Sequence, residues 1–208
     1  YRDDNIAIKS YGEDQVYREL TYAQLYIEVE KFATALKSMG VQKGDRVVGF
    51  IPNIPEAIIA MLATSSIGAI WSSSSPDFGI KGVLDRFSQI EPKVVVAADG
   101  YYFKGKSFDS LEKLDGILTD LPSVEKVVVV KYINKGEIFH IANAIWWEDF
   151  SQSITSQLTF EQLPFDHPLY IMYSSGTTGK PKSIVHSAGG TLIQHLKELI
   201  LHTDLKRN

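Results

Sequence analysis

The sequence contains no cysteine among its 208 residues, so it can form neither a disulfide-stabilised miniprotein nor a thiolate metal site. It also lacks an excess of basic residues, since 21 Lys and Arg stand against 25 Asp and Glu for a net charge of −4. A chain of this charge has no general attraction for nucleic acid. Any anion that it binds must therefore be held by a local group of residues.

Long apolar runs are missing as well. The one long uncharged stretch covers residues 57–76, and it contains Thr64, Ser65, Ser66, Gly68 and four consecutive serines over residues 72–75. It is too polar to cross a bilayer, and it predicts a buried helix followed by a buried strand. No basic stretch leads into an apolar one near the first residue, as a secretory signal requires, so we expect a cytoplasmic protein.

Helical and strand patterns alternate along most of the chain. Thr21 and Gln24 form a capping-box start for the first expected helix, and Gly40 supplies its end. Helices are also expected after Pro55, over residues 80–87 and over residues 111–121, and strands are expected over residues 47–51, 94–96 and 127–130. This alternation predicts an α/β fold with a mainly parallel sheet and helices on both faces. Residues 131–168 are irregular and are interpreted only as loop with short strands.

One loop carries the sharpest chemical signal. A buried strand is predicted over residues 169–173, and the chain then reads SSGTTGKPK over residues 174–182. Glycines let the backbone approach an anion closely, N–H groups and four hydroxyls can donate to phosphate oxygens, and two lysines add positive charge. This composition suits the triphosphate of a nucleotide.

The loop differs from a Walker A motif. Only two residues separate Gly176 from Gly179, and Pro181 stands where a Ser or Thr should bind magnesium. A flexible surface turn rich in small polar residues is the alternative interpretation, because such clusters mark most loops. The two lysines and the preceding strand favour phosphate binding.

Residues 173–182 resemble the signature loop of the adenylate-forming superfamily, which includes acyl-CoA synthetases, luciferases and the adenylation domains of nonribosomal peptide synthetases. Residues 20–25 are similar to the first core motif of that superfamily, and residues 66–77 fall where its second lies. Within the superfamily, the resemblance is greatest to the acetoacetate–CoA ligase branch. The segments that carry this narrower resemblance are residues 69–79, 85–87, 183–190 and 195–197.

The resemblance implies an AMP-forming acid–thiol ligase of lipid and fatty acid metabolism. In such an enzyme a carboxylate, here acetoacetate, attacks the α-phosphate of ATP and releases pyrophosphate. The thiol of coenzyme A then displaces AMP from the acyl-adenylate. A ligase for another short-chain acid, such as acetate or propionate, and a noncatalytic nucleotide-binding module are the alternatives.

The resemblance also implies roles for the loop residues. Lys182 and Thr178 are expected to be catalytic, because preorganised donors stabilise the charge that moves onto the leaving phosphates. Lys180 occupies a variable position of the family and is expected only to help. The residues expected to bind the ATP phosphates are Ser174, Ser175, Gly176, Thr177, Thr178, Gly179, Lys180 and Lys182.

A weaker resemblance concerns coenzyme A. Lys104 and Lys106 follow an expected strand, at a position similar to one where acetyl-CoA synthetases place arginines against the nucleotide phosphate of coenzyme A. Lysine lacks the bidentate geometry of arginine. A solvated basic turn is the alternative interpretation.

The sequence predicts no metal site of its own. His186, His195 and His202 lack ligand spacing, and the Mg²⁺ that accompanies ATP is expected to find its ligand outside this chain. The family's adenine pocket and the lysine of its mobile small domain have no counterpart here. We therefore interpret residues 1–208 as a partial N-terminal, AMP-binding domain of a larger ligase, with the remainder and the small C-terminal domain absent, and we expect the isolated piece to be inactive. The oligomeric state has no signal in the sequence.

Overall fold

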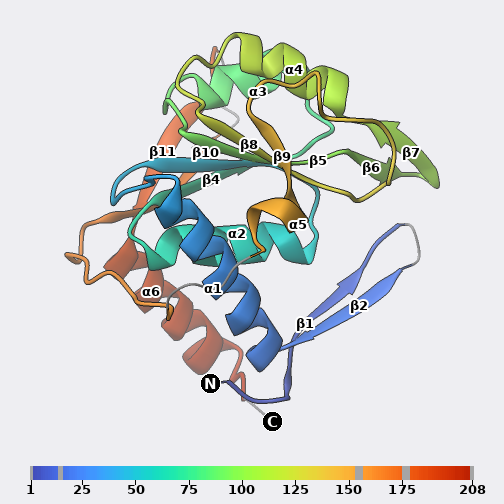
Figure 1. The fold of residues 1–208 in the computed structure, drawn as a ribbon. Coiled ribbons are helices and arrows are strands. Elements are labelled where there is room, and N and C mark those ends of the chain that lie inside the picture. The colour runs from blue at the N-terminus through green and yellow to red at the C-terminus, as the bar shows by residue number, and fades with distance from the viewer. Residues whose placement is uncertain (1, 14–15, 153–156, 175–178, 207–208) are drawn as a thin grey trace.

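A computed structural model describes residues 2–13, 16–152, 157–174 and 179–206. Its centre is one large sheet made of β3 (Arg46–Phe50), β4 (Ile70–Ser74), β5 (Val94–Ala98), β8 (Lys126–Val130), β9 (Ala144–Trp146), β10 (Pro168–Ser174) and β11 (Lys182–Ser187). These seven strands lie in the order β11-β10-β4-β3-β5-β8-β9 (Figure 1). Neighbouring strands are parallel except for β10 and β11, which are antiparallel. The predicted mainly parallel sheet is confirmed.

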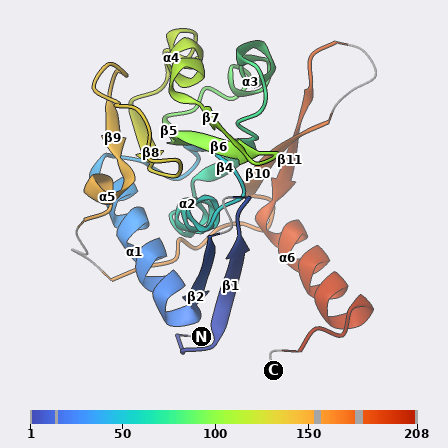
Figure 2. The same cartoon turned by 90° about the vertical axis from the view of Figure 1, so that its right-hand side faces the viewer.

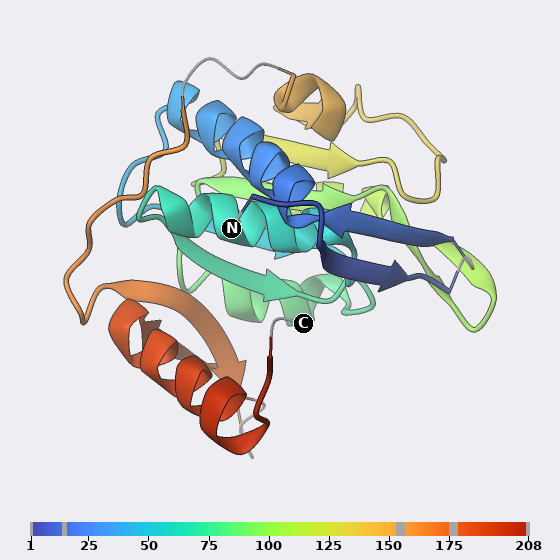
Figure 3. The same ribbon diagram turned by 90° about the horizontal axis from the view of Figure 1, so that it is seen from below.

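Helices cover both faces of the sheet (Figures 1 and 2). One face carries α3 (Ile80–Phe87) and α4 (Leu111–Thr119), and the other carries α1 (Tyr22–Ser38), α2 (Pro55–Ser66) and the short α5 (Trp147–Phe150). At the β10–β11 edge lie α6 (Ala188–Leu196) and the π-helical segment η1 (Lys197–His202), as Figure 3 shows. The predicted placement of helices on both faces is confirmed.

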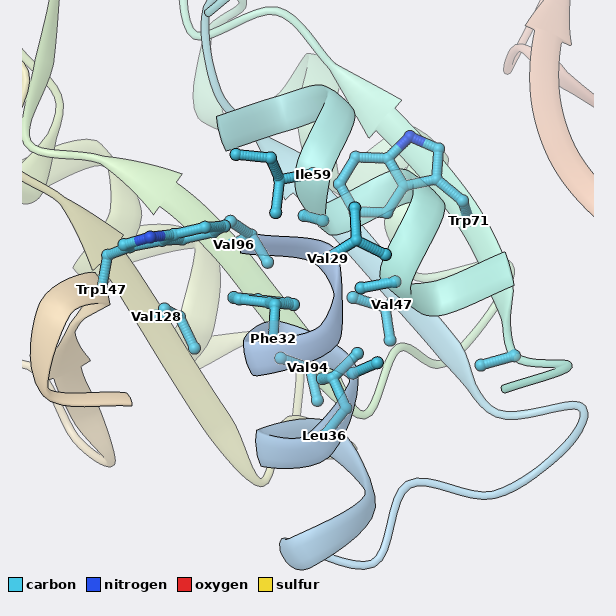
Figure 4. Packing of buried hydrophobic residues seen from close by; sticks show 14 of the residues in the cluster. Val29, Phe32, Leu36, Val47, Ile59, Trp71, Val94, Val96, Val128 and Trp147 are labelled. Atoms are coloured by element: carbon cyan, nitrogen blue, oxygen red, sulfur yellow. The ribbon is translucent and has the colours of Figure 1, made fainter. Parts of the chain in front are cut away.

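Alternate residues of the central strands enter two separate cores. In β5, Val94 and Val96 join the core under α1 and α2, whereas Val95 and Ala97 join the core under α3 and α4. Successive side chains of a strand point to opposite faces, so a strand covered on both sides must be apolar throughout. In the α1 core, the ring of Phe32 stacks on Trp147 with centroids 4.3 Å apart (Figure 4).

The first helix begins as its sequence predicts. The Thr21 hydroxyl accepts a hydrogen bond from the Gln24 N–H at 3.1 Å, and the Gln24 side-chain oxygen accepts one from the Thr21 N–H at 2.9 Å. Each bond satisfies an N–H group that the helix itself leaves unpaired. Gly40, with φ of +83°, follows the end of the helix.

Several short elements have no counterpart in the sequence patterns. Two hairpins form separate sheets: β1 (Ile6–Tyr11) with β2 (Tyr17–Thr21), and β6 (Gly100–Phe103) with β7 (Lys106–Asp109). The irregular region beyond residue 131 contains β9, as a short strand was expected there, but also the one-turn helix α5. Short hairpins and single turns are held by contacts with the rest of the fold, so local periodicity does not reveal them.

The uncharged stretch of residues 57–76 forms most of α2 and then β4, as predicted. Throughout the described part of the chain, no helix combines the length and apolarity that crossing a membrane requires.

Candidate functional site

The glycine-rich loop joins β10 to β11, so it closes a hairpin at the edge of the large sheet. Ser174, the last residue of β10, is paired with Lys182, the first residue of β11. Gly179 has φ of +89°, a conformation that residues with a side chain rarely adopt. Four of the predicted phosphate-binding residues lie outside the described residues: Ser175, Gly176, Thr177 and Thr178.

The loop leaves β10 at the carboxyl end of a strand that pairs in parallel with β4. In open α/β sheets, ligands bind in the crevice outside the carboxyl ends of the parallel strands. The carboxyl end of β4 carries a run of serines over residues 72–75. The candidate phosphate loop therefore lies at the end of the sheet where this architecture places ligands.

The two lysines of the loop have different surroundings. Lys180 Nζ lies 4.0 Å from Asp85 Oδ1, and Asp85 Oδ2 accepts a hydrogen bond from Lys81 Nζ at 2.7 Å. The hydrogen bond from Lys81 is the main cause that holds the pKa of the Asp85 carboxyl below its usual value, with Lys180 contributing less. Lys182 is exposed, and among the described residues it has no ion-pair partner. Its charge is thus available to an incoming anion.

A cavity of about 520 Å³ lies next to the loop, between β4, β10, α3 and α6. In it the Arg86 guanidinium lies 4.5 Å from the ring centroid of Phe78 and 5.8 Å from that of Tyr173. Burial raises the pKa of the Tyr173 hydroxyl, so the side chain stays neutral at physiological pH. The Ser72 hydroxyl donates a hydrogen bond to the Tyr173 hydroxyl at 3.3 Å, and this bond links β4 to β10. The cavity combines an aromatic wall, one cation and several hydroxyls.

Two residues beside the loop, Arg86 and Gln89, were not predicted as site residues, although residues 85–87 carry part of the family resemblance. Arg86 reaches the cavity from α3, and Gln89, just after α3, contacts the base of the loop. Both precede the loop by more than 80 residues, and only the pairing of distant strands brings them to it. The spacing of apolar residues in α3 predicts which face of the helix is buried, but it does not indicate what the other face contacts.

Lys104 and Lys106 lie at a tight turn. Lys104 and Gly105 have φ of +50° and +74°, and they connect β6 to β7 in a hairpin whose register pairs Phe103 with Lys106. Lys104 Nζ lies 5.2 Å from the ring centroid of Phe103, and both lysines are exposed. The strand expected before them, over residues 94–96, is present as β5, whereas the β6–β7 hairpin that contains them was not predicted. Their turn belongs to a separate hairpin from that of the glycine-rich loop.

Within the residues that the structure describes, no three His, Asp or Glu side chains are grouped so that they could hold a metal ion. His186 lies in β11 and His195 in α6, and both are exposed.

A mainly parallel α/β sheet with a loop rich in glycine, hydroxyl and lysine at the carboxyl end of a strand is typical of nucleotide-binding domains. The chain belongs to the AMP-binding enzyme family, whose family model matches residues 1–206. The resemblance to adenylate-forming enzymes is thereby confirmed.

Individual relatives narrow the comparison. The chain is 52% identical over 201 residues to acetoacetyl-CoA synthetase of Macaca fascicularis, a match that covers 93% of this chain and 30% of that protein. It is 48% identical over 198 residues to acetoacetyl-coenzyme A synthetase of Rhizobium meliloti (strain 1021), covering 94% of this chain and 30% of that protein. The solved acetoacetyl-CoA synthetase from Streptomyces lividans matches with a TM-score of 0.91 and 41% identity, over 97% of this chain and 31% of that one. The chain thus spans about 30% of the length of the relatives it matches.

Proposed function

We propose that residues 1–208 are part of the N-terminal, AMP-binding domain of an ATP-dependent acetoacetate–CoA ligase. The single observation that carries the proposal is the loop of residues 174–182, which leaves a parallel strand at the ligand-binding end of the sheet and begins β11 with an exposed lysine. The identity of 52% to an acetoacetyl-CoA synthetase supports acetoacetate as the acid. The remainder of that domain and a small C-terminal domain complete the enzyme.

In the proposed first step, a carboxylate oxygen of acetoacetate attacks the α-phosphorus of ATP. The bond from that phosphorus to the bridging oxygen breaks, and the electron pair leaves with pyrophosphate. Main-chain N–H groups, the hydroxyls of the loop and the Lys182 ammonium stabilise the charge that gathers on the β- and γ-phosphates. Thr178 and Lys182 are assigned the catalytic contacts, and the other loop residues hold the phosphates.

In the proposed second step, the thiol of coenzyme A loses its proton to solvent, its sulfur attacks the acyl carbon, and AMP leaves with the electron pair of the broken acyl–oxygen bond. Lys104 and Lys106 are assigned to the nucleotide phosphate of coenzyme A, which their exposure at the β6–β7 turn permits. Mg²⁺ neutralises phosphate charge when it is bound with ATP, and we place its ligands in the remainder of the protein. The enzyme is assigned to the cytoplasm and to lipid and fatty acid metabolism.

The test is ATP–pyrophosphate exchange by the complete protein that contains this chain, measured separately with acetoacetate, acetate and propionate. We expect acetoacetate to give the highest kcat/KM. A higher value with another short-chain acid would reassign the substrate. Binding of ATP without exchange for any acid would overturn the ligase proposal in favour of a noncatalytic nucleotide-binding module. The isolated residues 1–208 are expected to fold at least in part but to release no pyrophosphate.

A further inference from the structure

Gln89 lies in the turn that follows α3, and its side-chain amide reaches the base of the glycine-rich loop. Nε2 donates hydrogen bonds to the carbonyl oxygen of Asp85 at 2.5 Å and to that of Pro181 at 2.8 Å. Oε1 accepts a hydrogen bond from Ser183 Oγ at 3.1 Å. One amide therefore joins the end of α3 to the residues on both sides of Lys182.

The hydrogen-bond network fixes how this amide is oriented. A glutamine amide has two N–H donors at its nitrogen, and here each donor meets a backbone carbonyl oxygen. The reversed orientation would place the amide oxygen against both carbonyl oxygens, which have no proton to share. The contact therefore requires a donor and an acceptor on the same planar group, which glutamine supplies at this length.

The helix that precedes Gln89 is packed firmly against the core. Val83 and Phe87 of α3 are fully buried in the core under α3 and α4. One helical turn before Gln89, Asp85 lies within ion-pair distance of Lys180. Asp85 of α3 thus contacts the loop at Lys180, and Gln89 contacts it on either side of Lys182. The opposite face of α3 is packed into the core.

We infer that Gln89 is a positioning residue for the phosphate loop, an inference that rests on the proposed function. It holds the carbonyl group of Pro181 and the side chain of Ser183, so that the intervening Lys182 begins β11 in a fixed direction. Gln89 itself does not touch the nucleotide. It reduces the freedom that the Lys182 side chain would lose when the β- and γ-phosphates bind.

The test measures the KM for ATP and kcat of the complete ligase in Gln89→Met, Lys182→Ala and the double variant. Methionine keeps the length of the side chain but makes none of the three hydrogen bonds. We expect Gln89→Met to raise the KM for ATP by about threefold to tenfold, the range for a lost hydrogen bond or two, and to leave the KM for the acid unchanged. We expect no further rise when Lys182 is already Ala, because Gln89 acts through that residue.

Three further variants separate positioning from a general effect on the fold. Ser88→Ala is the matched control, since Ser88 Oγ donates only within α3, to the Leu84 carbonyl at 2.5 Å, and its KM for ATP should equal that of the unaltered enzyme. Gln89→Glu keeps the length but faces two carbonyls with a carboxylate, so it should behave like Gln89→Met. Ser183→Ala removes one of the same bonds without altering α3, and it should raise the KM for ATP by about twofold to threefold.

The outcomes distinguish the inference from the proposed function. If Lys182→Ala raises the KM for ATP while neither Gln89→Met nor Ser183→Ala changes it, Gln89 does not position the loop and the inference is wrong. The inference is also wrong if Gln89→Met has an equal effect with and without Lys182. If Lys182→Ala leaves the KM for ATP unchanged, the phosphate-binding role of the loop fails, and the inference fails with it.

Discussion

Ser174 and Lys182 face each other across the antiparallel ladder of β10 and β11. This pairing closes the loop of residues 175–181 at its base, so the register of an edge hairpin sets where the loop begins and where it ends. β10 is at the same time bonded to β4 in the parallel part of the sheet. The base of the loop is therefore attached to the central sheet of the domain.

Two glycines with the same backbone conformation provide a matched pair of variants. Gly179 and Gly40 have φ of +89° and +83°, and at either position an added Cβ would meet no atom of the described residues within 4 Å. We expect Gly179→Ala and Gly40→Ala each to lower the free energy of unfolding by about 1–2 kcal/mol, the cost of a left-handed residue with a side chain. Only Gly179→Ala should also raise the KM for ATP, because only that glycine lies in the loop. An equal effect of the two variants on the KM for ATP would contradict the site assignment.

The buried carboxylate of Asp99 holds the backbone that follows β8. Its Oδ1 accepts hydrogen bonds from the N–H groups of Tyr132 and Ile133, both at 2.8 Å, and its Oδ2 accepts one from the N–H of Lys135 at 3.1 Å. Asp99→Ala removes the acceptor for all three bonds, and we expect it to lower the free energy of unfolding by about 3–5 kcal/mol.

Asp99→Asn is the graded control in urea unfolding, since its one carbonyl oxygen can still accept the two bonds now made by Oδ1. It should cost less than Asp99→Ala. A loss below about 1 kcal/mol for Asp99→Ala would show that this loop does not depend on the carboxylate.

The lowered pKa of Asp85 predicts how the free energy of unfolding changes at acid pH. The hydrogen bond from Lys81 lowers the pKa of the Asp85 carboxyl in the folded protein. The folded state thus holds the proton less tightly than the unfolded state, so the carboxylate stabilises the fold above the ordinary carboxyl pKa and this contribution is lost as pH falls through the lowered one. We expect Asp85→Asn to be less stable than the unaltered chain at pH 7, with a difference that shrinks below about pH 4.

Urea unfolding at a series of pH values measures that difference. Lys81→Met removes the main partner of Asp85 and should reproduce the same pH dependence. A stability difference that stays constant down to pH 2 would contradict the assigned role of Asp85.

The layout of the domain could be predicted from local patterns because its elements are long or continuously apolar. The capping box at Thr21 and the valine runs of β5 and β8 identify their elements without any tertiary contact. The β1–β2 and β6–β7 hairpins and the single turn α5 were missed, since each is short and is stabilised by neighbouring elements. These elements form because distant segments pack against them, and the spacing of apolar residues in the sequence does not reveal such packing.

The site likewise has a part that local sequence predicts and a part that depends on contacts between distant segments. The composition of residues 174–182 indicates a phosphate loop directly, because the chemistry is contained in one continuous segment. Arg86 and Gln89 reach the loop and the adjacent cavity only through the crossover that places β4 beside β10. Residues 85–87 carry part of the family resemblance, but no pattern around α3 indicates that Arg86 or Gln89 lies beside the loop, so the three-dimensional structure was needed to place them.

The dissociation constants of ATP and AMP for the complete protein and its Lys182→Ala variant test the central claim most directly. The claim is that the loop holds the β- and γ-phosphates, which AMP lacks. We predict that Lys182→Ala weakens ATP binding by about tenfold or more, as expected for the loss of a charged donor, and leaves AMP binding unchanged. Equal affinities of the variant and the unaltered protein for ATP, or an equal loss for ATP and AMP, would contradict the claim.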